Sequence, residues 1–165
     1  IYSDLGIKFN SPTINLFFYP KDFIKFLKKL DYYLNLELIE VEENNINYPI
    51  GLLGDIKIYF KHYVTFKDAK KKWNERKKRI NKENIFIIFT DRDNCTYEDM
   101  IEFDNLNYEN KIIFTKCKYE KIKSSFYIKG FENKESVGIL SDFKNILAKR
   151  YIDQFDYIAW FNNKI

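Results

Sequence analysis

The stretch Ile85–Met100, IFIIFTDRDNCTYEDM, decides the fold that the sequence predicts. Its first six residues, Ile85–Thr90, are all apolar or β-branched, which is typical of a strand buried on both faces. The run ends abruptly in the charged residues 91–93, and Thr96 then opens a helix as its N-cap. A strand that ends in carboxylates and leads into a helix is where an α/β protein usually places its functional groups.

The segments on either side of this stretch extend the pattern to β-α-β-α-β over residues 55–116. The expected strands are Ile56–Phe60, Ile85–Thr90 and Lys111–Thr115, and the expected helices run from Thr65 or Asp68 to about Lys82 and from Thr96 to about Asp104. Connections of this length allow parallel strands with right-handed crossovers. The sequence therefore predicts a three-layer α/β fold, with a mostly parallel (mixed) sheet around a Rossmann-like core.

The flanking segments supply further elements of the same domain. They predict a helix after Pro20, an edge strand at Leu36–Val41, a strand at Ser124–Lys129, a helix from Ser141 or Asp142 to Lys149, and a last helix at Ile152–Phe161. A chain of 165 residues is large enough to bury one core. We therefore expect residues 1–165 to form a single α/β domain.

Charge and cysteine usage exclude several classes of protein. The net charge is +4, but Lys67–Glu83 alone holds nine basic and three acidic residues, so the basicity belongs to one segment. That distribution disfavours a protein coated evenly for nucleic acid. No apolar run approaches the roughly 20 residues of a membrane helix. Cys95 and Cys117 form neither a zinc motif nor a disulfide framework, which favours a reducing cytoplasm.

The predicted parallel strands would bring polar residues together at one edge of the sheet. His62, residues 91–93 and Thr115-Lys116 follow the three strands, and the carboxyl ends of parallel strands meet at the ligand-binding edge. Asp91 and Asp93 are then candidate catalytic residues and ligands for Mg²⁺ or Mn²⁺. Alternatively, these carboxylates accept backbone hydrogen bonds in the loop. His62 is either a proton-transfer residue or a histidine at the rim of the core.

The basic helix and the residues after the strand supply candidate substrate-binding groups. Arg76 falls in the apolar stripe with Trp73, and an inward arginine needs a carboxylate, an aromatic face or an anionic ligand. Arg79 lies one turn further along the same helix. Arg92 is the cation within the carboxylate cluster.

Cys95 has two possible roles beside the helix that Thr96 opens. A helix N-terminus can lower the pKa of a thiol and make it a nucleophile. Alternatively, Cys95 packs against Met100 as a hydrophobic staple. The sequence leaves both roles open, and Cys95 joins the candidate substrate-binding residues.

Six stretches of the sequence carry a family resemblance. They are FNSPTINLFFYPKDFIKFL, YPIGLLGDIKIYFKHY, the A-x3-W-x2-R-x2-RI run at Ala69–Ile80, FTDRDNCTYED, IKSSFYIKGFEN and RYIDQFDYIAWFN, and they cover essentially the whole chain. Together they resemble a family of uncharacterised bacterial proteins associated with exopolysaccharide biosynthesis. The resemblance implies an α/β fold and an association with surface polysaccharide, sometimes alongside glycosyltransferases. It also implies a short strand and an Asn-Asn-Cys-like turn before Ile1. It implies no mechanism and no catalytic residues.

These observations support three hypotheses about function. The first is a cytoplasmic, glycosyltransferase-like enzyme of polysaccharide synthesis that acts on a sugar or a phosphate-activated sugar. In it, Asp91 and Asp93 hold a metal or sugar hydroxyls, Arg76 and Arg79 face phosphate, and His62 moves a proton. The second is a non-catalytic partner of a polysaccharide synthase, or a carbohydrate-binding protein. The third, a nucleic-acid-binding module that uses the basic helix, is the least favoured.

Overall fold

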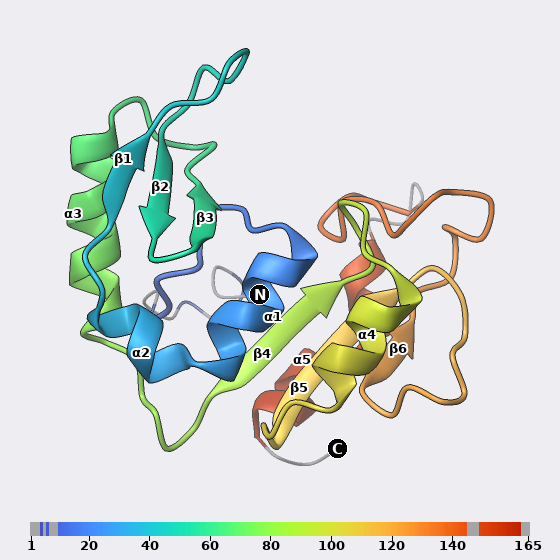
Figure 1. The fold of residues 1–165 in the computed structure, drawn as a ribbon. Helices are drawn as coiled ribbons and strands as arrows, with labels where there is room; N and C mark the ends of the chain where they lie inside the picture. The colour runs from blue at the N-terminus through green and yellow to red at the C-terminus, as the bar shows by residue number, and fades with distance from the viewer. Residues whose placement is uncertain (1–3, 5, 7–9, 145–148, 163–165) are drawn as a thin grey trace. The chain divides into compact units, whose positions relative to one another are not determined.

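A computed structural model describes residues 4, 6, 10–144 and 149–162 of the chain. The chain divides into two compact units, Ile1–Asn84 and Ile85–Ile165, each with its own small sheet (Figure 1). Both units mix helices with strands, so the α/β class is confirmed. Among the described residues, no helix is long and apolar enough to cross a membrane.

The first unit is built on an antiparallel sheet in the order β1-β2-β3. Its strands are β1 (Ile39–Val41), β2 (Ile50–Leu53) and β3 (Ile56–Tyr59), and its helices are α1 (Pro20–Lys28), α2 (Leu30–Asn35) and α3 (Phe66–Lys77). Pro20 starts α1, where its missing N–H costs nothing. Thr65 caps α3 by accepting a hydrogen bond from the Asp68 amide. Phe26 of α1 packs against Trp73 of α3 with ring centroids 6.1 Å apart.

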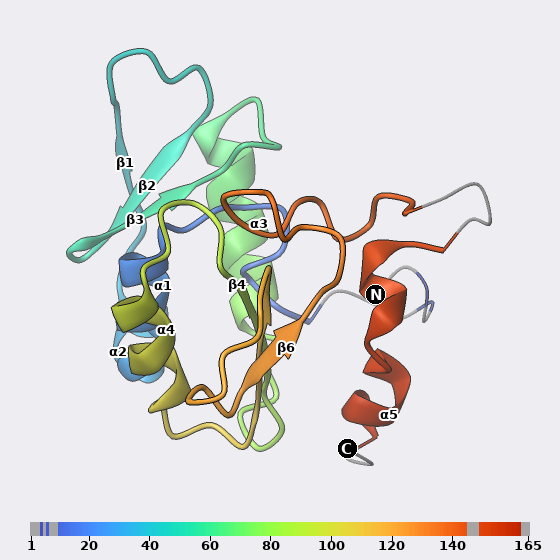
Figure 2. The ribbon, with the colours of Figure 1, turned by 90° about the vertical axis from the view of Figure 1, so that its right-hand side faces the viewer.

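The second unit is built on a parallel sheet in the order β4-β5-β6. Its strands are β4 (Phe86–Thr90), β5 (Asn110–Thr115) and β6 (Ser125–Tyr127), and its helices are α4 (Tyr97–Asp104), a 3-10 helix at Tyr151–Gln154, and α5 (Tyr157–Phe161). Helices α4 and α5 lie on opposite faces of this sheet (Figures 1 and 2). Phe89 stacks on Phe103 of α4, while Phe86 contacts Trp160 of α5. The predicted β4-α4-β5 connection is therefore confirmed.

The prediction that the Ile56–Phe60 strand is parallel to the Ile85–Thr90 strand is wrong. β3 pairs with β2 in an antiparallel hairpin instead, with Ile50 opposite Tyr59. The two strands are joined by the tight turn Gly54-Asp55, in which Gly54 has φ +66°. A two-residue turn with positive φ favours a hairpin over a crossover. The Rossmann-like core expected over residues 55–116 therefore does not include β3.

The C-terminal helices also differ from the prediction. The helix expected to end at Lys149 falls partly on residues 145–148, which lie outside the described residues. Phe143 and Arg150, on either side of them, form an antiparallel bridge, so the described flanks are not helical. The helix expected at Ile152–Phe161 is interrupted, because the Asp156 side chain accepts a hydrogen bond from the Ala159 amide and caps α5.

Candidate functional site

The carboxyl ends of β4, β5 and β6 lie at one edge of the parallel sheet. Thr90 is opposite Phe114, and Thr115 is opposite Tyr127, so the residues that follow these positions meet at this edge. Ligands of open α/β sheets bind at such an edge. We call the side chains gathered there the sheet-edge cluster, and they are Asp91, Cys95, Cys117, Tyr119, Tyr127 and Glu132.

Asp91 is the buried carboxylate of the sheet-edge cluster. Its side chain is 7% exposed, and its Oδ2 and Oδ1 accept hydrogen bonds of 2.7 Å from the amides of Lys116 and Val137. Its own amide donates to the Phe114 carbonyl at 3.1 Å. Asp91 thus ties the end of β4 to the end of β5 and to a loop 46 residues further along the chain. These contacts match the alternative in which the carboxylate accepts backbone hydrogen bonds.

The residues after Asp91 form a tight turn at the surface. Asp93 and Asn94 have φ values of 58° and 64°, and the Cys95 amide donates to the Arg92 carbonyl at 3.1 Å. Aspartate and asparagine are among the residues that tolerate left-handed backbone best, which explains their use here. Asp93 is exposed and Arg92 is half-buried. The turn therefore presents one carboxylate to solvent, beside a guanidinium.

The side chains of the described residues do not by themselves form a metal-binding site. No group of three or more His, Cys, Asp and Glu side chains among them is arranged to hold a metal ion. Both oxygens of Asp91 already accept backbone amides. The assignment of Mg²⁺ or Mn²⁺ to Asp91 and Asp93 stays a prediction, and we derive no chemical step through a metal.

Cys95 and Cys117 lie close enough to Tyr119 to affect the pKa of its hydroxyl. Burial raises the pKa of the Cys95 thiol to about 12, and the negative charges of Asp99 and Asp91 add to this effect. The pKa of Tyr119 is raised by a hydrogen bond with Cys117, by burial, and by the charges of Cys117, Asp91 and Cys95. A thiol with a raised pKa is protonated at neutral pH and is a poor nucleophile. The environment of Cys95 therefore favours its packing role.

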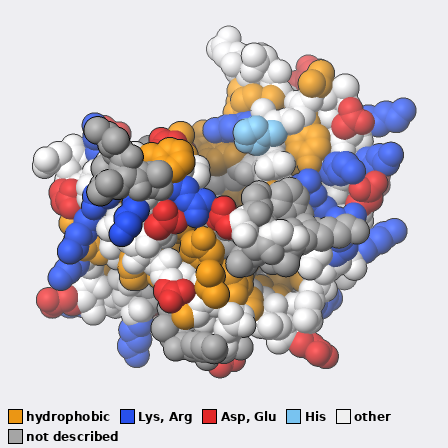
Figure 3. All heavy atoms as spheres, turned by 180° about the vertical axis from the view of Figure 1, so that it is seen from behind, with side chains coloured by type: hydrophobic (Ala, Val, Ile, Leu, Met, Phe, Trp, Pro, Cys, Tyr) orange, Lys and Arg blue, Asp and Glu red, His pale blue; other side chains and the backbone are white. Residues whose placement is uncertain are grey.

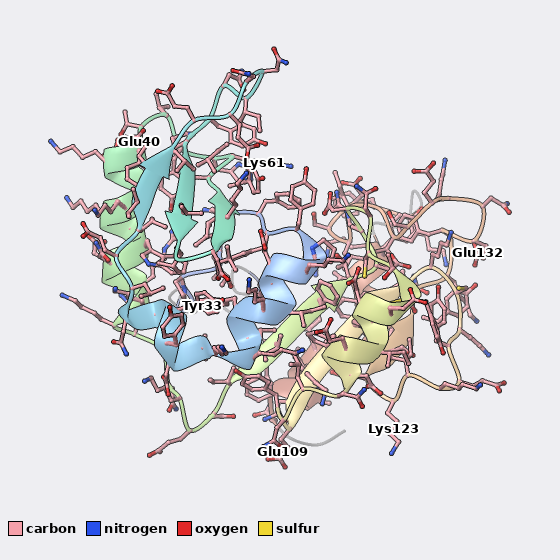
Figure 4. The ribbon with its side chains drawn as sticks, in the orientation of Figure 1. Tyr33, Glu40, Lys61, Glu109, Lys123 and Glu132 are labelled. Carbon is pink, nitrogen blue, oxygen red and sulfur yellow. The ribbon has the colours of Figure 1, made fainter. Side chains whose placement is uncertain are left out.

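Tyr127 and Glu132 complete the cluster, and no motif in the sequence indicated them. The Tyr127 hydroxyl donates to Glu132 Oε1, and the Gly130 amide donates to both carboxylate oxygens at 3.0 Å. The hydrogen bond from Tyr127, followed by those from backbone amides, lowers the pKa of Glu132 to about 2. Glu132 lies in the loop after β6 (Figure 4). It is a permanently charged, exposed hydrogen-bond acceptor at neutral pH.

Comparison with known proteins places the chain in a family. The model of the family described as "Domain of unknown function (DUF1919)" matches residues 1–162. The chain belongs to the DUF1919 family. A DUF1919 relative from Haemophilus influenzae, described as an uncharacterized protein, is 44% identical over 163 residues, which are 99% of this chain and 79% of the relative. The expected membership of an uncharacterised family is confirmed, while its link to polysaccharide synthesis stays a prediction.

The DUF1919 fold places the other predicted site residues in the first unit. His62 was expected to follow a strand of the parallel sheet, but β3 ends at Tyr59 and belongs to the other sheet, and His62 lies exposed in the turn that follows, pale blue in Figure 3. Because β3 belongs to the antiparallel sheet, no shared sheet brings His62 to Asp91. Arg79 is half-buried just after α3.

Arg76 and Trp73 lie on α3 of the DUF1919 fold with their side chains turned inward. Arg76 Nη1 donates to the Ile14 carbonyl at 2.7 Å, so one of its partners is a backbone carbonyl, which was not among the three expected partners. Trp73 is 1% exposed and packs in the core. The roles of Trp73, Arg76 and Arg79 in substrate binding stay predictions.

The pKa of Cys95 predicts slow alkylation in the folded DUF1919 protein. In a Cys117→Ser variant, Cys95 is the remaining thiol, because the chain has two cysteines. At pH 8 we expect iodoacetamide to modify it at least about tenfold more slowly than in the urea-unfolded chain, because each unit of pKa cuts the thiolate fraction about tenfold. The rate should keep rising with pH toward 12. A rate that levels off near pH 7 would instead identify an activated nucleophile.

Proposed function

We propose that this protein is a cytoplasmic enzyme of cell-surface polysaccharide biosynthesis that acts on a sugar or a phosphate-activated sugar. The observation that carries the proposal is the gathering of polar side chains at the carboxyl edge of the β4-β5-β6 sheet. Such edges are the usual ligand sites of open α/β folds. The resemblance to proteins associated with exopolysaccharide biosynthesis supports the choice of substrate.

The chemistry of the sheet edge suits a hydroxyl-rich, phosphate-bearing ligand. Glu132 keeps its charge at neutral pH and can accept hydrogen bonds from sugar hydroxyls, as can the exposed Asp93. Arg92 supplies a guanidinium, which binds phosphate in a bidentate geometry. Asp91 would act as a positioning residue, because it holds the ends of two strands and the loop at Val137. In this proposal, Asp93 and Glu132 contact substrate directly.

A thermal-shift screen of the full chain tests the proposal. Nucleotide sugars, nucleoside diphosphates and simple sugars would each be added with and without Mg²⁺ or Mn²⁺. A ligand at about 100 times its Kd should stabilise the protein by roughly 2.7 kcal/mol, which raises the Tm by several degrees. We expect Asp93→Asn and Glu132→Gln to abolish this shift and the release of nucleoside diphosphate from the donor.

A matched control is available at the opposite end of the sheet. Glu109 is exposed just before β5 begins and is labelled with Glu132 in Figure 4. Glu109→Gln changes the net charge as Glu132→Gln does. It should leave unchanged both the ligand-induced shift in Tm and the release of nucleoside diphosphate. Equal loss in both variants, or no shift with any ligand, would contradict the enzyme proposal.

The second candidate is a non-catalytic partner that binds carbohydrate for a polysaccharide synthase. Exposed tyrosine side chains favour it, because aromatic rings pack against the apolar faces of sugars. Tyr19, Tyr32 and Tyr97 are 44%, 57% and 41% exposed. This candidate predicts saccharide binding without product formation. Measuring the release of nucleoside diphosphate therefore distinguishes it from the enzyme.

A further inference from the structure

The excess positive charge of the chain lies on and just after α3. Residues 67–83 hold nine basic and three acidic side chains, against a net charge of +4 for the whole chain. Ala69 and Trp73 are 0% and 1% exposed and mark the side of α3 that packs in the core. With about 3.6 residues per turn, four polar residues share the opposite side of the helix. We call them the lysine row, and they are Lys67, Lys71, Asn74 and Lys78.

The lysines on one flank of the row are engaged with the rest of the first unit. Lys70 Nζ pairs with Glu37 Oε1 at 2.8 Å, and Lys77 Nζ donates to the Leu34 carbonyl at 2.9 Å. These contacts act together with the burial of Trp73 to fix the orientation of α3. The lysine row therefore projects from a helix that is held in place on its other sides.

Carboxylates border the row on its other flank. Glu75 pairs with Lys72 at 3.1 Å, and this hydrogen bond, followed by the charges of Lys72 and Lys71, lowers the pKa of Glu75. The exposed Asp68 accepts a hydrogen bond of 2.7 Å from Thr65 Oγ1. A broad anionic surface, such as a membrane, would meet these carboxylates as well as the lysines. The narrow row is better suited to a single linear chain laid along the helix.

The side chains of the lysine row are available to a partner. Lys67, Lys71 and Lys78 are exposed, and none of them forms an ion pair with a residue that the structure describes. The half-buried Asn74 lies between Lys71 and Lys78, and no hydrogen bond joins its side-chain amide to the described part of the chain. Lys78 extends the row as the C-cap of α3, where its φ of −73° and ψ of −10° are still helical.

The spacing of these lysines is wide compared with that of the phosphates in a nucleic acid. At about 1.5 Å per residue, Lys71 lies roughly 6 Å from Lys67 and roughly 10 Å from Lys78 along the helix axis. Phosphates of duplex DNA follow one another about every 3.4 Å along each strand. The row also has no aromatic side chain on which the bases of a single strand could stack. It therefore suits a linear polymer with more widely spaced charges.

We propose that the lysine row binds a linear acidic polysaccharide in which uncharged sugars separate the charged ones. The three lysines contact the anionic groups of the polymer as point charges. Asn74, between Lys71 and Lys78, bonds the hydroxyls of an uncharged sugar, since its amide offers two donors and an acceptor. The choice of a saccharide among linear polyanions rests on the proposed function, which this inference deepens by naming the class of polymer.

Fluorescence anisotropy of labelled polymers added to the full chain tests the proposal. Hyaluronate carries a carboxylate on alternate sugars, dextran carries no charge, and a thymidine oligonucleotide carries closely spaced phosphates. At one low ionic strength, we expect hyaluronate to bind at least about tenfold more tightly than dextran or the oligonucleotide, and added salt to weaken its binding.

Variants of the row should weaken the binding of hyaluronate. Lys67→Gln/Lys71→Gln/Lys78→Gln should weaken it at least about tenfold, because three charge contacts are lost together. Asn74→Ala should weaken it about threefold, through the loss of hydrogen bonds to hydroxyls. Glutamine forms helices about as well as lysine, and the three lysines are exposed, so the Tm of the triple variant should change little.

The matched control removes three lysines from the second unit. Lys121, Lys123 and Lys129 are exposed there, and Lys123 is labelled in Figure 4. Lys121→Gln/Lys123→Gln/Lys129→Gln makes the same change in net charge as the triple variant of the row. It should leave the binding of hyaluronate unchanged.

Failure of this proposal can be distinguished from failure of the proposed function. Hyaluronate binding needs no sugar donor, so Asp93→Asn should leave it unchanged while abolishing the release of nucleoside diphosphate. Equal loss of binding in the two triple variants, tighter binding of the oligonucleotide, or hyaluronate binding no stronger than that of dextran overturns the role of the lysine row. None of these results alters the release of nucleoside diphosphate, which tests the sheet-edge site.

Discussion

Replacing Asp91 with alanine should lower the free energy of unfolding by about 2–6 kcal/mol. The substitution removes the acceptor of two short backbone hydrogen bonds, from the amides of Lys116 and Val137. Asp91 is 7% exposed, so water cannot readily replace the lost carboxylate. Each buried donor left without a partner costs about 1–3 kcal/mol, and the loss of a charged acceptor lies at the upper end. Urea denaturation followed by circular dichroism measures the change.

Asp93 provides the control for that measurement, because it is an aspartate of the same loop without the burial. Asp93→Asn should change the free energy of unfolding by no more than about 0.5 kcal/mol, since asparagine also tolerates its φ of 58°. If Asp91→Ala were as mild as Asp93→Asn, the hydrogen bonds of Asp91 would not be holding the loop. Asp91 variants are consequently poor tests of function, and the ligand assays rest on Asp93 and Glu132.

Replacing Trp73 with alanine should destabilise the first unit by about 3–5 kcal/mol, the usual cost of removing a large buried aromatic side chain. Trp73 is 1% exposed and contacts Phe26 in the core. Trp73→Phe should cost less, about 1–2 kcal/mol. It leaves a smaller cavity, and it removes an indole Nε1 that has no hydrogen-bond partner among the described residues. Urea denaturation followed by circular dichroism compares the two variants.

The chain's second tryptophan provides an internal reference for this prediction. Trp160 lies in the other unit, where it contacts Phe86, so its fluorescence reports on the parallel-sheet unit. Similar stabilities for Trp73→Ala and the unchanged protein would show that the indole is not a core side chain. A Trp73→Phe variant that keeps its stability but loses ligand binding would instead support the predicted substrate contact.

The part of the fold that the sequence predicts well is local. Neighbouring residues are enough to predict β4 from its apolar run, the start of α4 from the Thr96 cap with Asp99, and the next strand, β5. The sequence does not predict β2, because Gly51 and Gly54 give the segment the composition of a turn. A Cβ at Gly51 would lie 2.6 Å from Leu38 Cδ1, so this glycine serves close packing within a strand. That requirement comes from tertiary structure, which a local pattern does not contain.

The candidate site is predicted only in part, again because tertiary structure brings some of its residues together. Asp91, Arg92, Asp93 and Cys95 are consecutive or nearly so, and a single turn places them together. Tyr119 and Glu132 come from later loops and Tyr127 from the end of β6, and they reach the sheet edge only because β5 and β6 are parallel to β4. The raised pKa of Tyr119 likewise depends in part on Asp91 and Cys95, which are distant from it in sequence. The sequence therefore indicates where the candidate site lies but not most of its side chains.

The contrast between the two sheets has a consequence for the order of folding. In the antiparallel sheet, Leu53 pairs with Ile56 across one tight turn, and hairpins of this kind close in about 1–10 μs. In the parallel sheet, Phe86 pairs with Asn110 only after the segment that contains α4 has crossed over. Contacts between residues distant along the chain slow folding, because loop entropy is lost before pairing is gained. The strands that carry the candidate site are thus the ones expected to assemble late, so a newly made chain would hold an ordered hairpin before it holds a complete site.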